Sequence, residues 1–510
     1  MKTIKLTALL IAAALTLTAC SGSDGASQDG ANIVLPNPPP NLERQILGDN
    51  TASASREVTL YRAADGTLEL TTLTRTIRAG ADGSLLRSTV AELLDMLPGG
   101  SALLVGGAQA TLEDVEFGGG VATVRLSIDA AVNRGDQDYL LLCASIANTL
   151  LGIEGVDAVN ILAGDRGNAI CALPSGTFTE QNGNIPAAYA QIQSERDRFL
   201  EEGTAHLERT ACLYFPAFGG QYLLPETRSI TFDSKDYASK LIEALCAGPL
   251  TRDCCFSAAP ANLDLLNSAP MLSVTPEGER VLDLSLSGVL TNYLAMSGVE
   301  PWQLYGSLTL TLTTFLPELD AVRVSIDGRY VTECDMGTHL AAFPEGLMRR
   351  SNFAHFVGAS AQLYFLDESG SLARVECAIS QAGSIFAESI LAAMITLGGS
   401  YLPDLSSVFP VGIGAEDVLG VEIDGRTAIV NLSGNFYAQC QSLNEQSERA
   451  LVYAMVNALA ELDSIGAVSF LVEGRQVDSL VGGIYLRTAL MPDPGLVRSH
   501  DTPAPDQMNG

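Results

Sequence analysis

Histidine and tryptophan are scarce in this sequence. Its 510 residues include one tryptophan, Trp302, and four histidines: His206, His339, His355 and His500. The first three histidines fall between the repeats described below, and the last falls near the C-terminal end. A hydrolase that uses histidine needs the imidazole in a cleft beside its nucleophile, and none of these positions favours that. The nucleophile-elbow, Ser-x-x-Lys, zinc-protease and phosphate-loop motifs do not occur either. We therefore expect no enzyme activity, no metal and no cofactor.

Lysine and arginine are also scarce relative to aspartate and glutamate. The chain has 29 Lys and Arg against 59 Asp and Glu, a net charge of −30, which becomes −32 if Lys2 and Lys5 are removed with a signal peptide. A field of that sign repels nucleic acid and anionic lipid headgroups, so no nucleic-acid partner is expected. The acid excess is expected to maintain solubility. A basic protein partner or loosely held cations are the alternatives.

No hydrophobic run reaches the roughly 20 residues that a membrane-spanning helix needs. The run Leu6 to Leu17 follows two lysines and ends at Leu17-Thr18-Ala19-Cys20, a pattern typical of a secretory signal peptide. Its last four residues look like a bacterial lipobox, in which the cysteine is diacylated and becomes the first mature residue. An ordinary signal peptide with a chance cysteine is the alternative. We expect a signal peptide over 1–20, a lipid on Cys20 and an extracytoplasmic protein anchored to the cell membrane.

Two terminal segments are expected to lack packed structure. Residues 21–55 begin with a Gly- and Ser-rich stretch and continue with four prolines, and residues 491–510 contain further prolines. Such composition cannot bury enough apolar surface to fold. We interpret 21–55 as a disordered tether and 491–510 as a disordered tail.

The remaining nine cysteines form no Cys-x-x-Cys motif, and an odd number cannot pair completely within one chain. Most are expected to be buried thiols, which behave as small hydrophobic groups. Cys212 with Cys246, or Cys377 with Cys440, could form a bridge inside one domain, because sequence does not decide connectivity.

The strongest pattern in the chain is a threefold repeat. Each copy opens with a Leu-Tyr pair, continues to a hairpin arm that ends in serine, and closes with Ala-Val. The three openings are Leu60-Tyr61, Leu213-Tyr214 and Leu363-Tyr364; the serines are Ser127, Ser285 and Ser433; the closing pairs are Ala158-Val159, Ala321-Val322 and Ala467-Val468. A period near 150 residues fits a whole domain. We expect domains at 56–166, 208–333 and 358–490, joined by linkers at 167–207 and 334–357.

Each copy has the pattern of an α+β domain. In the middle copy, Ala211 to Phe215 reads as a strand, and Tyr222 to Ile230 continues the sheet. Ser234 is expected to cap the first helix, and a hairpin and a second helix follow. The second helix is ambiguous, since Leu308 to Thr313 alternates like a strand. We expect three tandem copies of a two-layer β-α-β-β-α-β domain, with two helices on one face of its sheet.

These residues resemble the GerMN domain of the bacterial GerM family of sporulation and germination lipoproteins. The shared features are the opening strand, a helix leading to Gly-Pro, the hairpin arm, an Asn-Thr-Leu helix and the closing turn. In this chain they are Leu213-Tyr214-Phe215, Gly248-Pro249, Leu282-Asp283-Leu284-Ser285, Asn148-Thr149-Leu150 and Asp327-Gly328. The middle copy has Thr311 where the others have Asn148 and Asn457. The resemblance implies a non-catalytic envelope lipoprotein whose domain is similar to the ring-building folds of secretion-like complexes.

Other candidate site residues are expected to be structural. The three repeated serines lack a nearby base, so each is expected to bond backbone at a strand end. The acid pairs Glu113-Asp114, Asp367-Glu368 and Glu416-Asp417 fall at different places in the copies, whereas glycosidases need two carboxylates flanking one bond. The Asp-Gly pairs are expected to be turns. Trp302 is expected to pack the second helix of the middle copy, with a partner surface as the alternative.

We therefore expect a non-catalytic assembly or binding module of the cell envelope, acting in sporulation or germination. Its partners would be envelope or sporulation-complex proteins, with self-association possible, because linked copies raise the local concentration of binding sites. A wall hydrolase with paired carboxylates and a small-ligand-binding lipoprotein are the alternatives.

Overall fold

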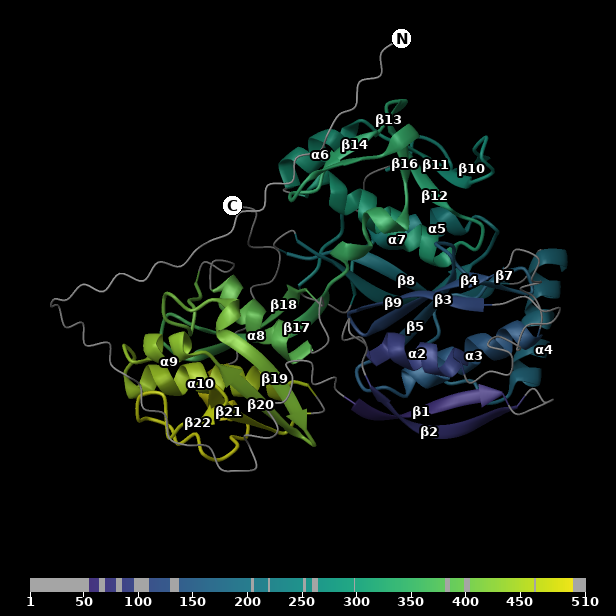
Figure 1. Cartoon of the computed structure of the whole chain (residues 1–510). Coiled ribbons are helices and arrows are strands. Elements are labelled where there is room, and N and C mark those ends of the chain that lie inside the picture. The colour runs from purple at the N-terminus through teal and green to yellow at the C-terminus, as the bar shows by residue number, and fades with distance from the viewer. Residues whose placement is uncertain are drawn as a thin grey trace, which may run out of the picture.

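The computed structural model describes residues 55–63, 69–78, 85–95, 110–128, 137–202, 206–218, 221–250, 254–258, 265–297, 299–380, 386–398, 404–462 and 465–498 (Figure 1). Cys20, the expected signal peptide and the expected tether lie outside the described residues, except that the first strand begins at Ser55.

The first copy consists of two small sheets and two helices. It contains β1 (Ser55–Ala63), β2 (Leu70–Arg78), α2 (Leu85–Asp95), β3 (Ala110–Gly118), β4 (Val121–Ile128), α3 (Gln137–Leu151) and β5 (Ala158–Ala163). Strands β1 and β2 pair antiparallel, while β3, β4 and β5 form a separate sheet in which β5 runs parallel to β4. Figure 1 shows α2 and α3 between the two sheets.

The second and third copies repeat this order. The second has β8 (Leu207–Pro216), β9 (Leu223–Phe232), α5 (Tyr237–Cys246), β10 (Met271–Val274), β11 (Arg280–Leu286), α6 (Val289–Ser297), α7 (Pro301–Phe315) and β12 (Ala321–Ile326). The third has β17 (Ala359–Leu366), β18 (Leu372–Ile379), α8 (Phe386–Leu397), β19 (Val418–Asp424), β20 (Thr427–Leu432), α9 (Gly434–Cys440), α10 (Glu445–Ala460) and β21 (Ala467–Val472).

The α+β class and the threefold repeat are confirmed. The structure refines the expected β-α-β-β-α-β order, because every copy opens with two paired strands in a sheet separate from that of the later strands, and in the third copy β23 (Val497–Arg498) joins this pair. The first and last helices of a copy thus have the sheet of the later strands on one side and the opening pair on the other. The second helix of each copy is consequently enclosed, and twelve of the fifteen residues of α3 are buried.

This enclosure explains the ambiguous pattern in the middle copy. Residues Leu308 to Thr313 alternate like a strand but lie in the helix α7, in which every residue after Pro301 is buried. A helix covered on all sides does not need a polar face, so its sequence need not show a 3.6-residue period. Trp302 is 2% exposed at the start of this helix, and its ring centroid lies 4.4 Å from that of Phe356. The expected packing role of Trp302 is confirmed.

Both segments between the copies are ordered where described. Residues 167–202 form β6 (Ala169–Ile170), β7 (Leu173–Pro174), α4 (Ile185–Arg196) and a π-helical turn (Asp197–Glu202). Asn148 on α3 holds this segment, because its side chain bonds both the N–H and the C=O of Asn182, at 2.9 and 3.0 Å. After the second copy come β13 (Arg329–Tyr330), β14 (Glu333–Asp335), β15 (Leu340–Ala342), β16 (Leu347–Met348) and three short 3₁₀ turns.

The third copy holds its own C-terminal segment in the same manner. Asn457 on α10 accepts from the Asp493 N–H at 2.9 Å and donates to its C=O at 3.3 Å. Two short strands follow β21, β22 (Arg475–Gln476) and β23 (Val497–Arg498), and β23 pairs parallel with β18.

The opening strands of the first two copies differ in burial. Along β1 the buried residues Val58 and Leu60 alternate with partly or fully exposed ones, whereas all residues from Ala211 to Pro216 of β8 are buried. Val121 and Ala158 of the first copy belong to the same buried apolar cluster as these β8 residues. Figure 1 shows β8 and β9 lying between α7 and the sheet of the first copy. Packing on both sides is therefore the reason that β8 is a continuous apolar run.

Candidate functional site

The three described histidines lie on the segments between the copies. His206 is exposed and contacts Asp233, and the His339 and His355 rings lie 6.3 Å apart on the segment between the second and third copies. Burial, and then the neighbouring His339, lower the pKa of His355. His500 lies outside the described residues. Over the described ranges, no group of three His, Cys, Asp or Glu side chains is placed to hold a metal ion.

The repeated serines do not recur in one role. Ser433 caps α9 by accepting from the Phe436 N–H at 3.0 Å, and its hydroxyl donates to Asp417 at 2.5 Å. The expected bond from serine to backbone is thus present in the third copy. For Ser285 it is the main-chain oxygen that is engaged, accepting from the Asn267 N–H at 2.8 Å.

In each adjacent acid pair, one carboxylate is exposed and the other makes polar contacts. Asp114 contacts Arg87, and Asp367 accepts from the Ser369 and Ser371 N–H groups at 2.8 and 2.9 Å. Asp417 is 5% exposed and accepts from Ser433 and Asn435. The carboxylates beside them, Glu113, Glu368 and Glu416, are exposed.

Two of the expected Asp-Gly turns are present. Asp327 and Gly328 follow β12 with φ values of 48° and 77°, and Gly425 has φ 59° in the turn that joins β19 to β20. Asp327 also accepts from the Gly288 N–H at 3.1 Å. Asp65-Gly66 and Asp82-Gly83 lie outside the described residues.

The thiols are mainly buried. Cys246, Cys377 and Cys440 are free, so neither bridge considered from the sequence is formed. Burial raises the pKa of Cys377 and of Cys440 to about 12, and that of Cys246 to about 11. These groups are therefore neutral near pH 7 and are weak nucleophiles.

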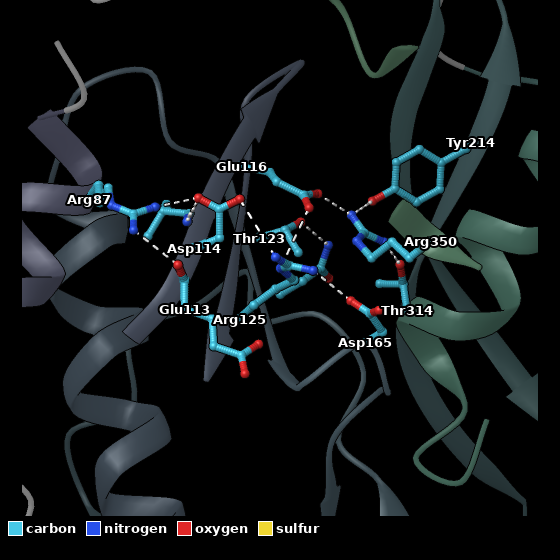
Figure 2. A network of polar contacts seen from close by, with 12 residues as sticks. Arg87, Glu113, Asp114, Glu116, Thr123, Arg125, Asp165, Tyr214, Thr314 and Arg350 are labelled. Carbon is cyan, nitrogen blue, oxygen red and sulfur yellow. Dashed lines mark hydrogen bonds and ion pairs between the residues drawn. The ribbon is translucent and has the colours of Figure 1, made fainter. Parts of the chain in front are cut away.

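A polar network joins the first two copies (Figure 2). Its centre is Arg350, which is 1% exposed and lies on the segment that follows the second copy. The Arg350 Nη2 atom lies 2.6 Å from Oε2 of Glu116 on β3, and its Nη1 atom lies 2.7 Å from the hydroxyl of Thr314 on α7. The Tyr214 hydroxyl lies 3.4 Å from Nη2. One guanidinium thus bonds residues from both copies.

A second arginine continues the network on the surface of the first copy. Arg125 on β4 lies 2.6 Å from Asp165, 3.8 Å from Asp114 and 3.9 Å from Glu116. Figure 2 shows Arg125 and Arg350 converging on Glu116 from opposite sides. Three carboxylates and two arginines therefore lie in one strip along the outer face of the β3-β4-β5 sheet.

Two groups of this network have shifted pKa values. Burial alone would lower the pKa of Arg350, but the Glu116 carboxylate and Tyr214 raise it above its usual value. Burial also raises the pKa of Tyr214 to about 12. Near neutral pH the arginine therefore stays charged and the phenol stays neutral.

Close backbone contacts also join the copies. A Cβ atom on Gly167 would lie 2.6 Å from the carbonyl carbon of Phe315, and one on Gly118 would lie 2.8 Å from the carbonyl oxygen of Gly358. Gly358 also donates its N–H to the Leu223 C=O at 3.1 Å. The first two copies and the start of the third therefore meet at one closely packed junction.

The sequence analysis did not identify Arg350, Glu116 or Glu448 as structural centres. Glu448 on α10 is fully buried and accepts from the N–H groups of Leu480, Val481 and Gly483 at 2.7, 2.8 and 2.5 Å. A glutamate two positions before the apolar Ala450-Leu451-Val452 run gives no local sign of burial. Arg350 lies 234 positions from Glu116, and the N–H partners of Glu448 lie 32 or more positions away, so no pattern along the chain could pair them.

Several apolar side chains remain exposed on the second copy. Met271, Leu272 and Val274 on β10 are 66%, 52% and 65% exposed, and Met296 on α6 is 88% exposed. In contrast, the enclosed hollow in the core of this copy, next to Tyr214 and Ser307, has a volume of about 10 Å³. That is room for one water molecule, not for a metabolite. Within the described residues no helix is long and apolar enough to cross a membrane.

Comparison with solved structures gives low-similarity matches. The tandem GerMN domains of the sporulation protein GerM from Bacillus subtilis match with 16% identity over 57% of this chain and 99% of theirs, at a TM-score of 0.24. The first GerMN domain of that protein matches with 20% identity over 26% of this chain and 97% of its own, at a TM-score of 0.23. A candidate lipoprotein from Clostridium perfringens matches with 22% identity over 26% of this chain and 87% of its own, at a TM-score of 0.19. No curated protein matches.

The family comparison covers most of the chain. The model described as "Germane: Sporulation and spore germination" matches residues 59–167, 212–332 and 362–478, and each match holds the opening pair, the helices and the three-stranded sheet of one copy. The repeated order of elements and the family model agree on the same three segments. The chain therefore belongs to the Germane family, with three copies of its domain.

Proposed function

We propose that this protein is a non-catalytic assembly or binding module of the cell envelope, acting in sporulation or germination. The observation that carries the proposal is the threefold match to a family described by sporulation and spore germination. The polar residues of the junction support it, because Arg350 bonds Glu116 of the first copy and Thr314 of the second and so holds the two copies together. The ordered contacts between the copies favour a stiff platform that presents surfaces at fixed spacing.

The proposed location is the outer side of the cell membrane, with a lipid on Cys20. The pattern at residues 17–20 supports this location. The tether of about 35 residues would give the first copy a reach of roughly 30–35 Å from the membrane. A lipid anchor would also concentrate the protein in two dimensions and so favour weak contacts with envelope partners.

Crosslinking and pull-down with the full-length protein test the proposal. Cells would be compared during sporulation and during vegetative growth, with Cys20→Ser as the matched variant. We expect an envelope or sporulation-complex protein to be captured with the wild type, and the Cys20→Ser variant to leave the membrane fraction and lose that capture. A wild-type protein that captures no partner at either stage would contradict the proposal.

The acid pairs allow a separate test of the hydrolase alternative. Glu113→Gln, Glu368→Gln and Glu416→Gln each remove the exposed member of a pair and leave the engaged member in place. We expect each variant to keep the wild-type phenotype and wall composition. A hydrolase would lose activity in at least one of them, since both carboxylates of its pair are needed.

A further inference from the structure

Strand β10 is an exposed apolar edge of the second copy. It is the first strand in the order β10-β11-β12, and over the described residues no strand pairs with its other side. Its four residues are Met271, Leu272, Ser273 and Val274, and the three apolar ones are more than half exposed. Figure 1 shows β10 at the right-hand margin of this sheet. The strand is short, but it is regular and carries no charge.

In the other two copies, the equivalent edge strands are protected against pairing with another chain. Strand β3 shifts register between Leu112 and Asp114 and carries three carboxylates. Strand β19 shifts register between Val418 and Gly420 and carries two more, and its Val421 N–H donates to Glu388 at 3.0 Å. Bulges and charges are the usual means by which an edge strand avoids pairing with another chain. Strand β10 has neither, so it is the one of the three edges that is suited to pairing.

The turn after β10 shows which backbone groups of this strand point toward β11 and which point to the open edge. The Thr275 N–H donates to the Glu279 C=O at 2.8 Å, which places Thr275 toward β11. Backbone groups alternate in direction along an antiparallel strand. Met271 and Ser273 therefore also face β11, and the N–H and C=O groups of Leu272 and Val274 face the open edge.

We propose that β10 pairs with β10 of a second copy of this chain, antiparallel about a twofold axis at Ser273. In that register Leu272 pairs with Val274 of the second copy, Ser273 lies opposite Ser273 of the second copy, and four backbone hydrogen bonds form. The exposed Leu272 and Val274 side chains of both chains would then cover one another. Every pair across the axis is neutral, whereas pairing β3 or β19 with itself would oppose carboxylates.

The net charge gives the contact a distinct salt dependence. Two chains of net charge −30 repel one another at long range, and salt screens that repulsion while leaving the apolar contact in place. The dimer therefore strengthens as salt is added. If a basic partner bound at the same edge instead, its binding would weaken as salt is added. This inference rests on the proposed assembly function and names one of its partners.

A disulfide experiment on the full-length protein tests the register. Residues opposite each other in a non-hydrogen-bonded antiparallel pair have Cα atoms about 4.5 Å apart, within the range of a disulfide. We expect Ser273→Cys to give a covalent dimer under mild oxidation. The matched control is Met271→Cys on the same strand and face. It lies four residues from its symmetry mate, roughly 13 Å along the strand, and should form no covalent dimer, like the wild type.

Sedimentation of the purified protein tests the contact without oxidation. Leu272→Lys should shift the protein toward the monomer, and the control Leu340→Lys, at a site on β15 that is 66% exposed, should not. We expect at least a tenfold loss of dimer affinity in the first variant and none in the second.

Three results would overturn the proposal: no covalent dimer with Ser273→Cys, equal crosslinking with Met271→Cys, or unchanged association with Leu272→Lys. If Leu272→Lys abolished capture of a different protein in cells and left sedimentation unchanged, the edge would belong to that protein and not to a second copy. In that case the assembly function would stand while the dimer proposal failed.

Discussion

Arg350 and Glu116 lie 234 positions apart in the sequence, and the structure places Nη2 of the first 2.6 Å from Oε2 of the second. The contact brings the segment after the second copy onto the sheet of the first. The same guanidinium bonds Thr314 and contacts Tyr214, which both belong to the second copy. One charged group therefore joins the sheet of the first copy, the second copy and the segment that follows it. The first two copies should therefore lose stability together when that group is removed.

Arg350→Met should destabilise the junction by about 3–5 kcal/mol, because it leaves Glu116 without its buried partner. Urea unfolding followed by the fluorescence of Trp302, the only tryptophan in the chain, would report the loss in the second copy. Arg349→Met is the matched control, since Arg349 pairs with Glu279 on a surface that is about one-third exposed. Such a pair contributes about 0–1 kcal/mol. Equal losses in the two variants would show that burial of Arg350 has no special role.

Glu448→Gln should loosen the loop that follows β22 in the third copy. The carboxylate accepts from three backbone N–H groups, and an amide group cannot replace both oxygens as acceptors. We expect a cost of about 1–3 kcal/mol and faster hydrogen exchange at Leu480, Val481 and Gly483. Glu445→Gln, on the exposed side of the same helix, should leave exchange unchanged. Unchanged protection in Glu448→Gln would contradict the assignment.

Gly118→Ala should disturb the entry to the third copy. The new methyl group would lie 2.6 Å from a Val357 methyl carbon and 2.8 Å from the Gly358 carbonyl oxygen, and backbone cannot move aside without breaking the bond from Gly358 to Leu223. We expect a loss of about 1–3 kcal/mol in thermal unfolding. Gly183→Ala has no atom within 4 Å of the new carbon and should change stability by less than about 0.5 kcal/mol.

Stability should fall at alkaline pH. Burial raises the pKa of Cys143, Cys377 and Cys440 from 9.0 to about 12. The unfolded chain therefore releases these protons at lower pH than the folded one, and the folded state is favoured fully below pH 9 and less as pH rises from 9 to 12. Urea midpoints measured from pH 8 to 11 should decrease, and Cys377→Ala should lessen the decrease. A midpoint that stays constant over this range would contradict the burial of these thiols.

The fold class was predictable because it depends on patterns within each copy. The Leu-Tyr openings, the serine-ended hairpin arms and the Ala-Val closings occur at similar spacing three times, and each falls in the expected strand except Ser433, which directly follows β20. The first helix of the second copy is predicted almost correctly as well. Its cap is Asp236, which accepts from the Ser239 N–H at 3.2 Å, while the predicted cap Ser234 instead accepts from the Asp236 N–H.

Relations between copies were not predictable in the same way. The burial of β8 on both faces is visible as an apolar run, but a single sequence does not say what covers it. The role of Thr311 was not predictable either. Spacing to the closing strand equates it with Asn148, yet it accepts from the Tyr214 N–H at 3.1 Å, as Thr149 does from Tyr61 at 2.9 Å. If the helix is rotated by one residue, a different side chain reaches the sheet. The order of residues along the chain does not reveal such a rotation.

The two-sided cover of β8 has a consequence for biogenesis. The first copy is synthesised before the second, and its sheet supplies one of the two surfaces against which β8 packs. N-terminal domains generally fold first as a chain emerges. The second copy can therefore complete its core only once the first copy is in place. Maturation of this protein should thus proceed in one direction, from the first copy to the second.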